Sequence, residues 1–184
     1  YYQKMTAHTK VFQQELFDEM KSRIKEDDES VPYCYNGYFY ITRYEKGKDY
    51  PIYSRKKESL LAEEEIMFDC NLLAQGHAYF QLGGLSISPD NKWATFAIDT
   101  TGRRIYSLKI KNLETNEILN DLIENSTGES TWANDNKTIF YTNQDKITLR
   151  SDKIFRHKIG TDSVDDVLVY EEKDDTFHVD VSKE

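Results

Sequence analysis

The stretch that decides the fold reads Ser88-Pro89-Asp90-Asn91-Lys92-Trp93-Ala94-Thr95-Phe96-Ala97, an Asp/Asn turn that leads into a strand. Its pattern recurs in Ala133-Asn134-Asp135-Asn136-Lys137-Thr138-Ile139-Phe140-Tyr141-Thr142. The offset is 45 residues, both from Asp90 to Asp135 and from Phe96 to Tyr141. A period near 45 residues with several short strands per unit is typical of a β-propeller blade.

The same offset extends beyond the turn, because it links Ile110 with Phe155 and Glu117 with Asp162. The sequence therefore predicts a mainly-β fold with blades at about 32–82, 85–124 and 130–170, and the start of a fourth blade at Phe177. Asn36-Gly37 is a strong hairpin signal in the first of these blades, and an insertion is expected between residues 56 and 80. About three blades cannot close a ring, so we expect a fragment of a propeller.

The first 31 residues differ from the rest and predict a helix. Phe12, Leu16, Met20 and Ile24 are four residues apart and fall on one face, as in an amphipathic helix. The segment closes at Pro32, which disfavours helix in the residue before it. We expect the apolar face to dock against another part of the protein.

Composition excludes several kinds of partner. The chain has 24 Lys and Arg against 33 Asp and Glu, a formal net charge of −9, so no nucleic-acid partner is expected. No apolar run approaches the length of a membrane span, so no membrane partner is expected either. Cys34 and Cys70 form no metal-ligand pattern. The chain starts at Tyr1 with no initiator Met and no signal pattern, so either its start has been cut away or it begins inside a longer protein. We expect a cytoplasmic location, with the periplasm or another soluble compartment as alternatives.

Motifs for catalysis do not occur in this chain. It contains no GxSxG, HExxH, GxxxxGK[ST] or GxGxxG, so we assign no catalytic residue, metal site or cofactor. The four histidines are scattered and are expected to be structural or exposed, namely His8, His77, His157 and His178. The carboxylate runs at 63–65 and 171–175 are interpreted as solvated turns.

Several stretches, in order along the chain, resemble oligopeptidase B in the prolyl oligopeptidase group of serine peptidases. The similar stretches are Ser30-Val31-Pro32-Tyr33, Asn36-Gly37-Tyr38, Gly47-Lys48-Asp49-Tyr50-Pro51-Ile52-Tyr53, Leu85-Ser86-Ile87-Ser88-Pro89-Asp90-Asn91, Trp132-Ala133-Asn134-Asp135, Arg156-His157-Lys158-Ile159-Gly160-Thr161 and Tyr170-Glu171-Glu172-Lys173-Asp174-Asp175. No single stretch is specific, but their ordered combination covers nearly the whole chain.

The resemblance implies a two-domain enzyme. A seven-bladed propeller would cover a C-terminal α/β-hydrolase domain that carries a Ser-Asp-His triad outside this chain. Such enzymes cleave short peptides after Arg or Lys, so short basic peptides are the implied substrates, and the propeller restricts access to the active site. The N-terminal helix, Thr9 to Ile24, would pack near the catalytic domain. The chain alone would be inactive.

One turn is a candidate for contact between the two domains. Asp99-Thr100-Thr101-Gly102-Arg103-Arg104 carries two adjacent arginines. In related enzymes a charged residue of this turn faces the catalytic domain, so the resemblance implies an interdomain latch at Arg103 or Arg104. The alternative is two solvated arginines that shield nearby carboxylates, since surface ion pairs contribute little.

Two other functions stay open from the sequence. One is a stand-alone propeller that binds other proteins through its loops. The other is a peptidase of the same group that prefers proline or acyl-amino acids. A GxSxG motif downstream of Glu184 would favour the peptidases, because fold alone does not assign function.

Overall fold

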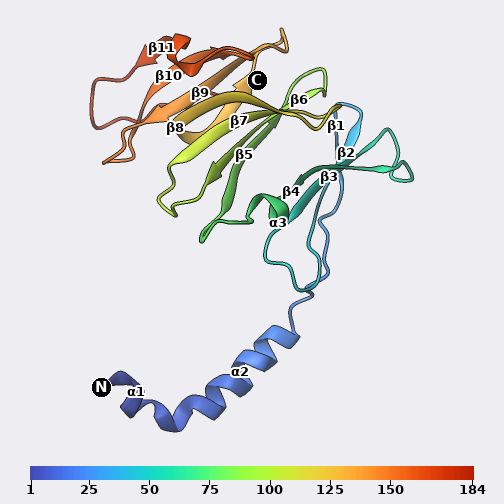
Figure 1. The fold of residues 1–184 in the computed structure, drawn as a ribbon, viewed down its shortest axis with the longest axis vertical. Helices are drawn as coiled ribbons and strands as arrows, with labels where there is room; N and C mark the ends of the chain where they lie inside the picture. Colours follow the sequence, from blue (N-terminus) through green and yellow to red (C-terminus); the bar gives the residue numbers. More distant parts are fainter. The chain divides into compact units, whose positions relative to one another are not determined.

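The computed structural model describes the whole chain, from Tyr1 to Glu184. It contains two compact units: Tyr1–Tyr33 with Phe39–Asn71, and Cys34–Tyr38 with Leu72–Glu184. The first unit carries the N-terminal helices and most of a four-stranded sheet, and the second carries a seven-stranded sheet (Figure 1).

The predicted N-terminal helix is confirmed. It is α2 (Lys10–Ser22), and it follows the short helix α1 (Tyr2–Met5) and the 3-10 turn η1 (Ala7–Thr9). No residue of α2 is buried, and its apolar stripe includes Phe12 and Met20, each 60% exposed. Since helices gain most of their stability from packing an apolar face, this stripe is suited to a partner.

The four-stranded sheet has the order β1-β2-β3-β4. Its elements are β1 (Tyr33–Tyr35), β2 (Tyr38–Arg43), β3 (Ile52–Lys57) and β4 (Glu64–Asp69), followed by the short helix α3 (Cys70–Leu73). The predicted hairpin between β1 and β2 is confirmed: Asn36 and Gly37 have φ values of 47° and 81°, as a type I′ turn requires.

The segment 56–80, expected to be an insertion, contains a strand of the sheet instead. β4 pairs antiparallel with β3, from Ile52 opposite Asp69 to Lys56 opposite Glu64. The insertion hypothesis is therefore wrong for this part. The sequence of β4 lacks the alternation of apolar and polar residues that indicates a strand, because its first half is exposed and begins with two glutamates of the acidic run 63–65.

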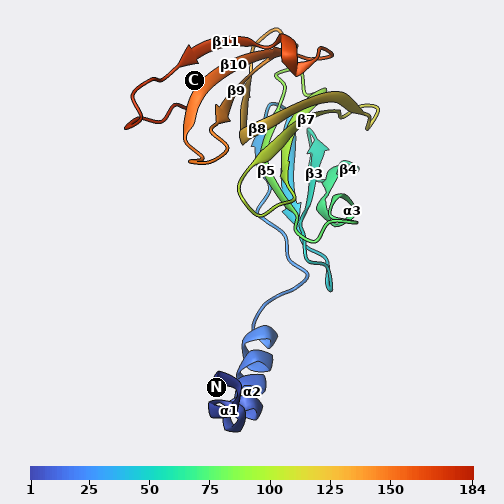
Figure 2. The same cartoon turned by 60° about the vertical axis from the view of Figure 1, so that its left-hand side comes forward.

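The second unit forms an antiparallel sheet in the order β11-β10-β9-β8-β7-β6-β5 (Figures 1 and 2). Its elements are β5 (Gln81–Ile87), β6 (Trp93–Asp99), β7 (Tyr106–Asn112), β8 (Ile118–Trp132), β9 (Thr138–Gln144), β10 (Ser151–Lys158), the 3-10 turn η2 (Ser163–Asp165) and β11 (Val167–Glu171). The Asp/Asn turns link β5 to β6 and β8 to β9, as the repeat predicts, with Asn91 and Asn136 at φ values of 62° and 58°.

Strand β8 serves both repeats of this sheet. Its first part pairs with β7, for example Leu122 opposite Lys109, and its last part pairs with β9, as in Trp132 opposite Ile139. Between the two parts, Asn125 and Gly128 have φ values of 60° and 100°. The 85–124 and 130–170 repeats are therefore joined by one strand that contains two left-handed residues.

One apolar core unites the two repeats. It consists of the buried residues Ala97, Tyr106, Leu108, Ile110, Ile123, Trp132, Ile139 and Tyr141. Trp93 packs against this core, whereas Phe96, only 1% exposed, is not part of it. This confirms that Trp93 and Phe96 lie on opposite faces of β6, as their odd spacing predicts.

Hydrogen bonds between loops define two ends of the second sheet. At the asparagine end, Asn136 Oδ1 accepts from Asp90 N at 3.0 Å, and Asn36 Nδ2 donates to Pro89 O at 2.7 Å. The arginine end is at the other tips of the strands and consists of the turn 99–105, the loop 145–150 and the segment 172–177. The asparagine end is thus tied across neighbouring repeats.

The expected start of a fourth blade forms no strand. Residues 172–184 have no helix or strand after β11, although Thr131 Oγ1 donates to Val181 O at 3.1 Å. A strand needs a neighbour for its backbone groups on at least one side, and Phe177–Val181 pairs too little for a ladder. None of the helices has the length and apolar character needed to cross a membrane.

Candidate functional site at the arginine end

The arginine turn, Asp99 to Arg104, is organised by one buried carboxylate. Asp99 is 0% exposed and lies at the end of β6. Its Oδ1 accepts from Thr101 N at 2.7 Å, Thr101 Oγ1 at 2.7 Å and Gly102 N at 3.1 Å, and its Oδ2 accepts from Arg104 N at 2.8 Å. A carboxylate that accepts four hydrogen bonds fixes the backbone of the turn.

A second contact comes from the neighbouring repeat. Gln144, at the end of β9, donates from Nε2 to Arg104 O at 2.7 Å. Both Arg103 and Arg104 are exposed, and neither guanidinium group has a hydrogen-bond or ion-pair partner in the chain. The turn therefore presents two free cations on a rigid backbone. The alternative in which they shield carboxylates of this chain has no ion pair to support it.

Protonation of Asp99 should open this turn. Burial on its own raises the pKa of Asp99, but the hydrogen bonds from Thr101, Arg104 and Gly102 outweigh it and lower the pKa below its ordinary value of 3.8. The ionised Asp99 therefore stabilises the folded turn fully at pH values above its ordinary pKa. This stabilisation is lost as the pH falls through the lower pKa that Asp99 has in the folded state.

We expect hydrogen exchange at Thr101, Gly102 and Arg104 to stay slow at neutral pH in the wild type and to become faster at neutral pH in Asp99→Ala. The loss is about 1 kcal/mol, at the lower end of the cost of leaving donors without their acceptor, because these hydrogen bonds are only partly buried. Asp90→Ala, in an exposed Asp/Asn turn at the asparagine end, is the matched control. Equal exchange in the two variants would contradict the role of Asp99.

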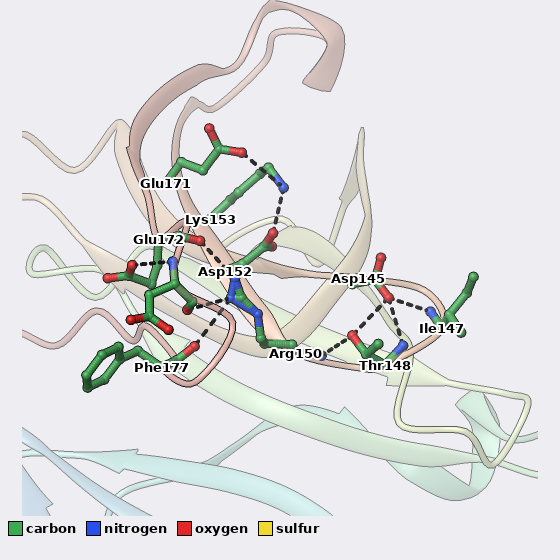
Figure 3. A network of polar contacts seen from close by, with 10 residues as sticks. Asp145, Ile147, Thr148, Arg150, Asp152, Lys153, Glu171, Glu172 and Phe177 are labelled. Atoms are coloured by element: carbon green, nitrogen blue, oxygen red, sulfur yellow. Dashed lines mark hydrogen bonds and ion pairs between the residues drawn. The ribbon is translucent and has the colours of Figure 1, made fainter.

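A second network at this end holds the segment that leaves the sheet (Figure 3). The guanidinium group of Arg150 donates to the carbonyl oxygens of Glu172 at 2.9 Å, Asp174 at 3.2 Å and Phe177 at 3.4 Å. Lys153 lies between Asp152, at 2.7 Å, and Glu171, at 3.6 Å. These contacts neutralise part of the acidic run 171–175, which the sequence predicted only as solvated.

The loop that carries Arg150 is itself preorganised. Asp145 accepts from Ile147 N at 2.9 Å, Thr148 N at 2.7 Å and Thr148 Oγ1 at 2.9 Å. No serine or cysteine side chain forms a hydrogen bond with a histidine anywhere in the chain, so the chain shows no nucleophile–base pair.

The arginine end instead holds charged side chains on a fixed backbone. Such a surface can bind or orient a partner.

Sequence reasoning missed a buried polar cluster around His157. The ring is 0% exposed; its Nδ1 lies 2.6 Å from Asp166 Oδ1 and its Nε2 lies 3.1 Å from Asp121 Oδ2. The hydroxyl of Tyr141 donates to Asp166 Oδ2 at 2.9 Å. Burial, and then this hydrogen bond, raise the pKa of Tyr141, so its hydroxyl keeps its proton. The signal that could have revealed the cluster is the 45-residue offset between Asp121 and Asp166.

Comparisons with known proteins place this architecture. The whole chain, residues 1–184, matches the family model described as prolyl oligopeptidase, N-terminal beta-propeller domain. It is 36% identical to a dipeptidyl aminopeptidase BI of Pseudoxanthomonas mexicana and 32% identical to a protease 2 of Moraxella lacunata. Both similarities cover 100% of this chain and 27% of the relative, so the chain spans about a quarter of the length of these proteins.

Solved structures give the same result. Oligopeptidase B from Leishmania major matches 94% of this chain and 25% of its own chain, with 33% identity and a TM-score of 0.85. Oligopeptidase B from Trypanosoma brucei, in a closed form with covalently bound antipain, matches 95% of this chain and 24% of its own, with 28% identity and a TM-score of 0.84. The mainly-β fold with an N-terminal helix and a partial propeller is therefore confirmed, and the chain belongs to the prolyl oligopeptidase family as a portion of its N-terminal β-propeller domain.

Proposed function

We propose that the chain is the propeller portion of a serine oligopeptidase of the oligopeptidase B type, which cleaves short peptides after Arg or Lys. The observation that carries the proposal is the likeness to oligopeptidase B from Leishmania major, at 33% identity and a TM-score of 0.85 over nearly the whole chain. The relative named protease 2 supports it at 32% identity. The ordered motifs from Ser30 to Asp175 point in the same direction.

In this proposal the chain performs no bond-breaking step. The nucleophile, base and acid belong to a C-terminal α/β-hydrolase domain outside residues 1–184, and the propeller admits only short, flexible peptides. Within the chain, the arginine turn is the proposed latch: Arg103 or Arg104 forms a bidentate ion pair with a carboxylate of that domain in the closed enzyme. The rigid backbone around Asp99 supports this role, because a preorganised donor loses less entropy on binding.

The exposed stripe of α2 is the second proposed contact. Phe12, Leu16 and Met20 of α2, spaced four apart, are all exposed, and the exposed Ile24 continues this spacing just beyond the end of the helix. Docking this face on the catalytic domain would remove the stripe from water, which stabilises an assembly by about 25 cal/mol per Å².

A dipeptidyl aminopeptidase is the second candidate function. The 36% identity to the dipeptidyl aminopeptidase BI of Pseudoxanthomonas mexicana favours it. The two candidates differ in what the enzyme requires at the substrate amino terminus. An endopeptidase for Arg or Lys tolerates a blocked amino group, whereas an enzyme that releases dipeptides from a free end does not.

A substrate panel on the full-length protein tests the proposal. We expect the largest kcat/KM for peptides with a blocked amino terminus and Arg or Lys before the scissile bond, compared with matched Pro peptides and with unblocked dipeptide amides. Hydrolysis of the unblocked dipeptide amides alone would support the second candidate. Preference for Pro would support a prolyl peptidase, and absence of hydrolysis would support a stand-alone binding propeller.

We also propose a cytoplasmic location. Both cysteines are free thiols: Cys34 is exposed, and burial, followed by the charge of Asp69, raises the pKa of the Cys70 thiol to about 12. Exposed free thiols persist where the compartment is reducing. Cell fractionation with an antibody to the full-length protein tests this location.

A further inference from the structure

Histidine 157 lies at the junction of the two repeats of the second sheet. The ring is fully buried, and each of its nitrogens faces a carboxylate whose side chain is at most 6% exposed. Asp121 belongs to the part of β8 that pairs with β7, and thus to the 85–124 repeat. Asp166 precedes β11 and belongs to the 130–170 repeat. The ring therefore connects one carboxylate from each repeat.

The hydrogen-bond inventory of the cluster limits where its protons are. An ionised carboxylate only accepts hydrogen bonds, and a neutral imidazole donates only one. Asp166 already accepts from Tyr141, and Asp121 Oδ2 accepts from Gly160 N at 2.6 Å. Both carboxylates are thus supplied with donors that suit their ionised form. With both carboxylates ionised, hydrogen bonds at Nδ1 and Nε2 need two N–H groups from His157.

We infer that His157 is held as an imidazolium between Asp121 and Asp166, and that it is a proton-dependent staple between neighbouring repeats. The loop that it fixes is 159–166, because Gly160 and Asp166 lie at the two ends of this segment. Ser163 Oγ adds a bond across the same junction, to Leu122 O at 2.9 Å. If the ring loses one proton, the nitrogen that lost it presents a lone pair to a buried carboxylate. The hydrogen bond between that nitrogen and the carboxylate is then lost, and the charged carboxylate has one donor fewer.

The ring has a defined set of ionisable neighbours. Asp121 faces it from β8 and Asp166 from the segment before β11, and Tyr141 of β9 reaches it through Asp166. Arg156 and Lys158 flank it on β10 but are exposed, since side chains alternate along a strand. The only charges in contact with the ring are therefore the two carboxylates.

The test is hydrogen exchange of the peptide covering 159–166 in the full-length protein, at about pH 6 and about pH 9, corrected for the intrinsic pH dependence of exchange. We expect protection in the wild type to fall at least about tenfold between the two conditions, because a buried acceptor loses its donor. In His157→Gln protection should be low at both, and the difference should disappear. His8→Gln, an exposed residue outside this unit, is the control and should behave as the wild type.

A second variant separates this staple from simple packing. In Asp121→Asn the amide can donate to an unprotonated Nε2, so protection of 159–166 should persist at the higher pH. Selective ¹⁵N labelling of histidine, with His157→Gln for assignment, should show both ring nitrogens of His157 protonated at about pH 6. A neutral tautomer at that pH, or the same pH dependence in the wild type, His157→Gln and Asp121→Asn, would overturn the inference.

Discussion

Replacing both Arg103 and Arg104 by glutamate in the full-length protein is expected to lower kcat/KM for short Arg or Lys peptides about tenfold. A tenfold change corresponds to about 1.4 kcal/mol in the open–closed equilibrium, which is within reach of one bidentate ion pair with a carboxylate. The midpoint of thermal unfolding should hardly change, because both side chains are exposed and neither guanidinium group has a hydrogen-bond or ion-pair partner within the chain. Steady-state kinetics and a thermal melt measure the two quantities.

The matched control is Lys146→Glu, a charge reversal in an exposed loop residue at the same end of the sheet. Like the double substitution, it makes the charge of this end of the sheet more negative, but it leaves the arginine turn unchanged. If the double variant has the same kcat/KM as the wild type, the latch proposal is wrong, but the peptidase proposal is unaffected. If the wild type itself fails to hydrolyse the peptides, the peptidase proposal fails first.

Gly84→Ala should be the most damaging single substitution in the sheet. Gly84 has a φ of 30°, and a Cβ there would lie 2.6 Å from the carbonyl carbon of Gly128 and overlap its oxygen. The obstacle is the backbone of β8, which cannot move away without separating β5 from the neighbouring repeat. We expect the free energy of unfolding to fall by about 3 kcal/mol or more, at or above the upper end for overpacking, because the clash is with backbone atoms. Denaturant or thermal unfolding of the full-length protein measures this loss.

Gly76→Ala is the control for the backbone angle alone. Gly76 has a φ of 83°, but a Cβ there meets no atom within 4 Å. The cost should be about 1 kcal/mol, the usual penalty of a left-handed conformation with a side chain. Similar losses in the two variants would show that the contact between Gly84 and Gly128 does not govern the packing of the two repeats.

The fold was largely predictable from sequence because its repeat is visible in the turns. Asp90-Asn91 and Asp135-Asn136 mark the same turn twice, since only residues that tolerate positive φ serve there, and the intervening strands alternate regularly. The Asn36 hairpin followed from the same chemistry. The helix was predictable from its four-residue spacing, which the structure shows on an exposed face.

The parts that escaped prediction depend on long-range contacts. Strand β4 carries charge on its exposed positions, so it lacks the alternation that would reveal it. The junction in β8 depends on Gly128 and Asn125 packing against another repeat, which no local pattern records. His157 looked like an isolated histidine because its two partners lie 36 and 9 residues away. For the arginine turn, the sequence indicated the free cations, but not the buried Asp99 that fixes them.

The central claim is that residues 1–184 contribute no catalytic group, and the most direct test is to locate the nucleophilic serine. The full-length protein is treated with a serine-reactive fluorophosphonate, and the labelled peptide is identified by mass spectrometry. If residues 1–184 restrict access and perform no chemistry, we expect a single labelled serine outside this range. The labelled protein should no longer hydrolyse Arg and Lys peptides. Stoichiometric labelling of a serine within residues 1–184, with the same loss of activity, would contradict the account.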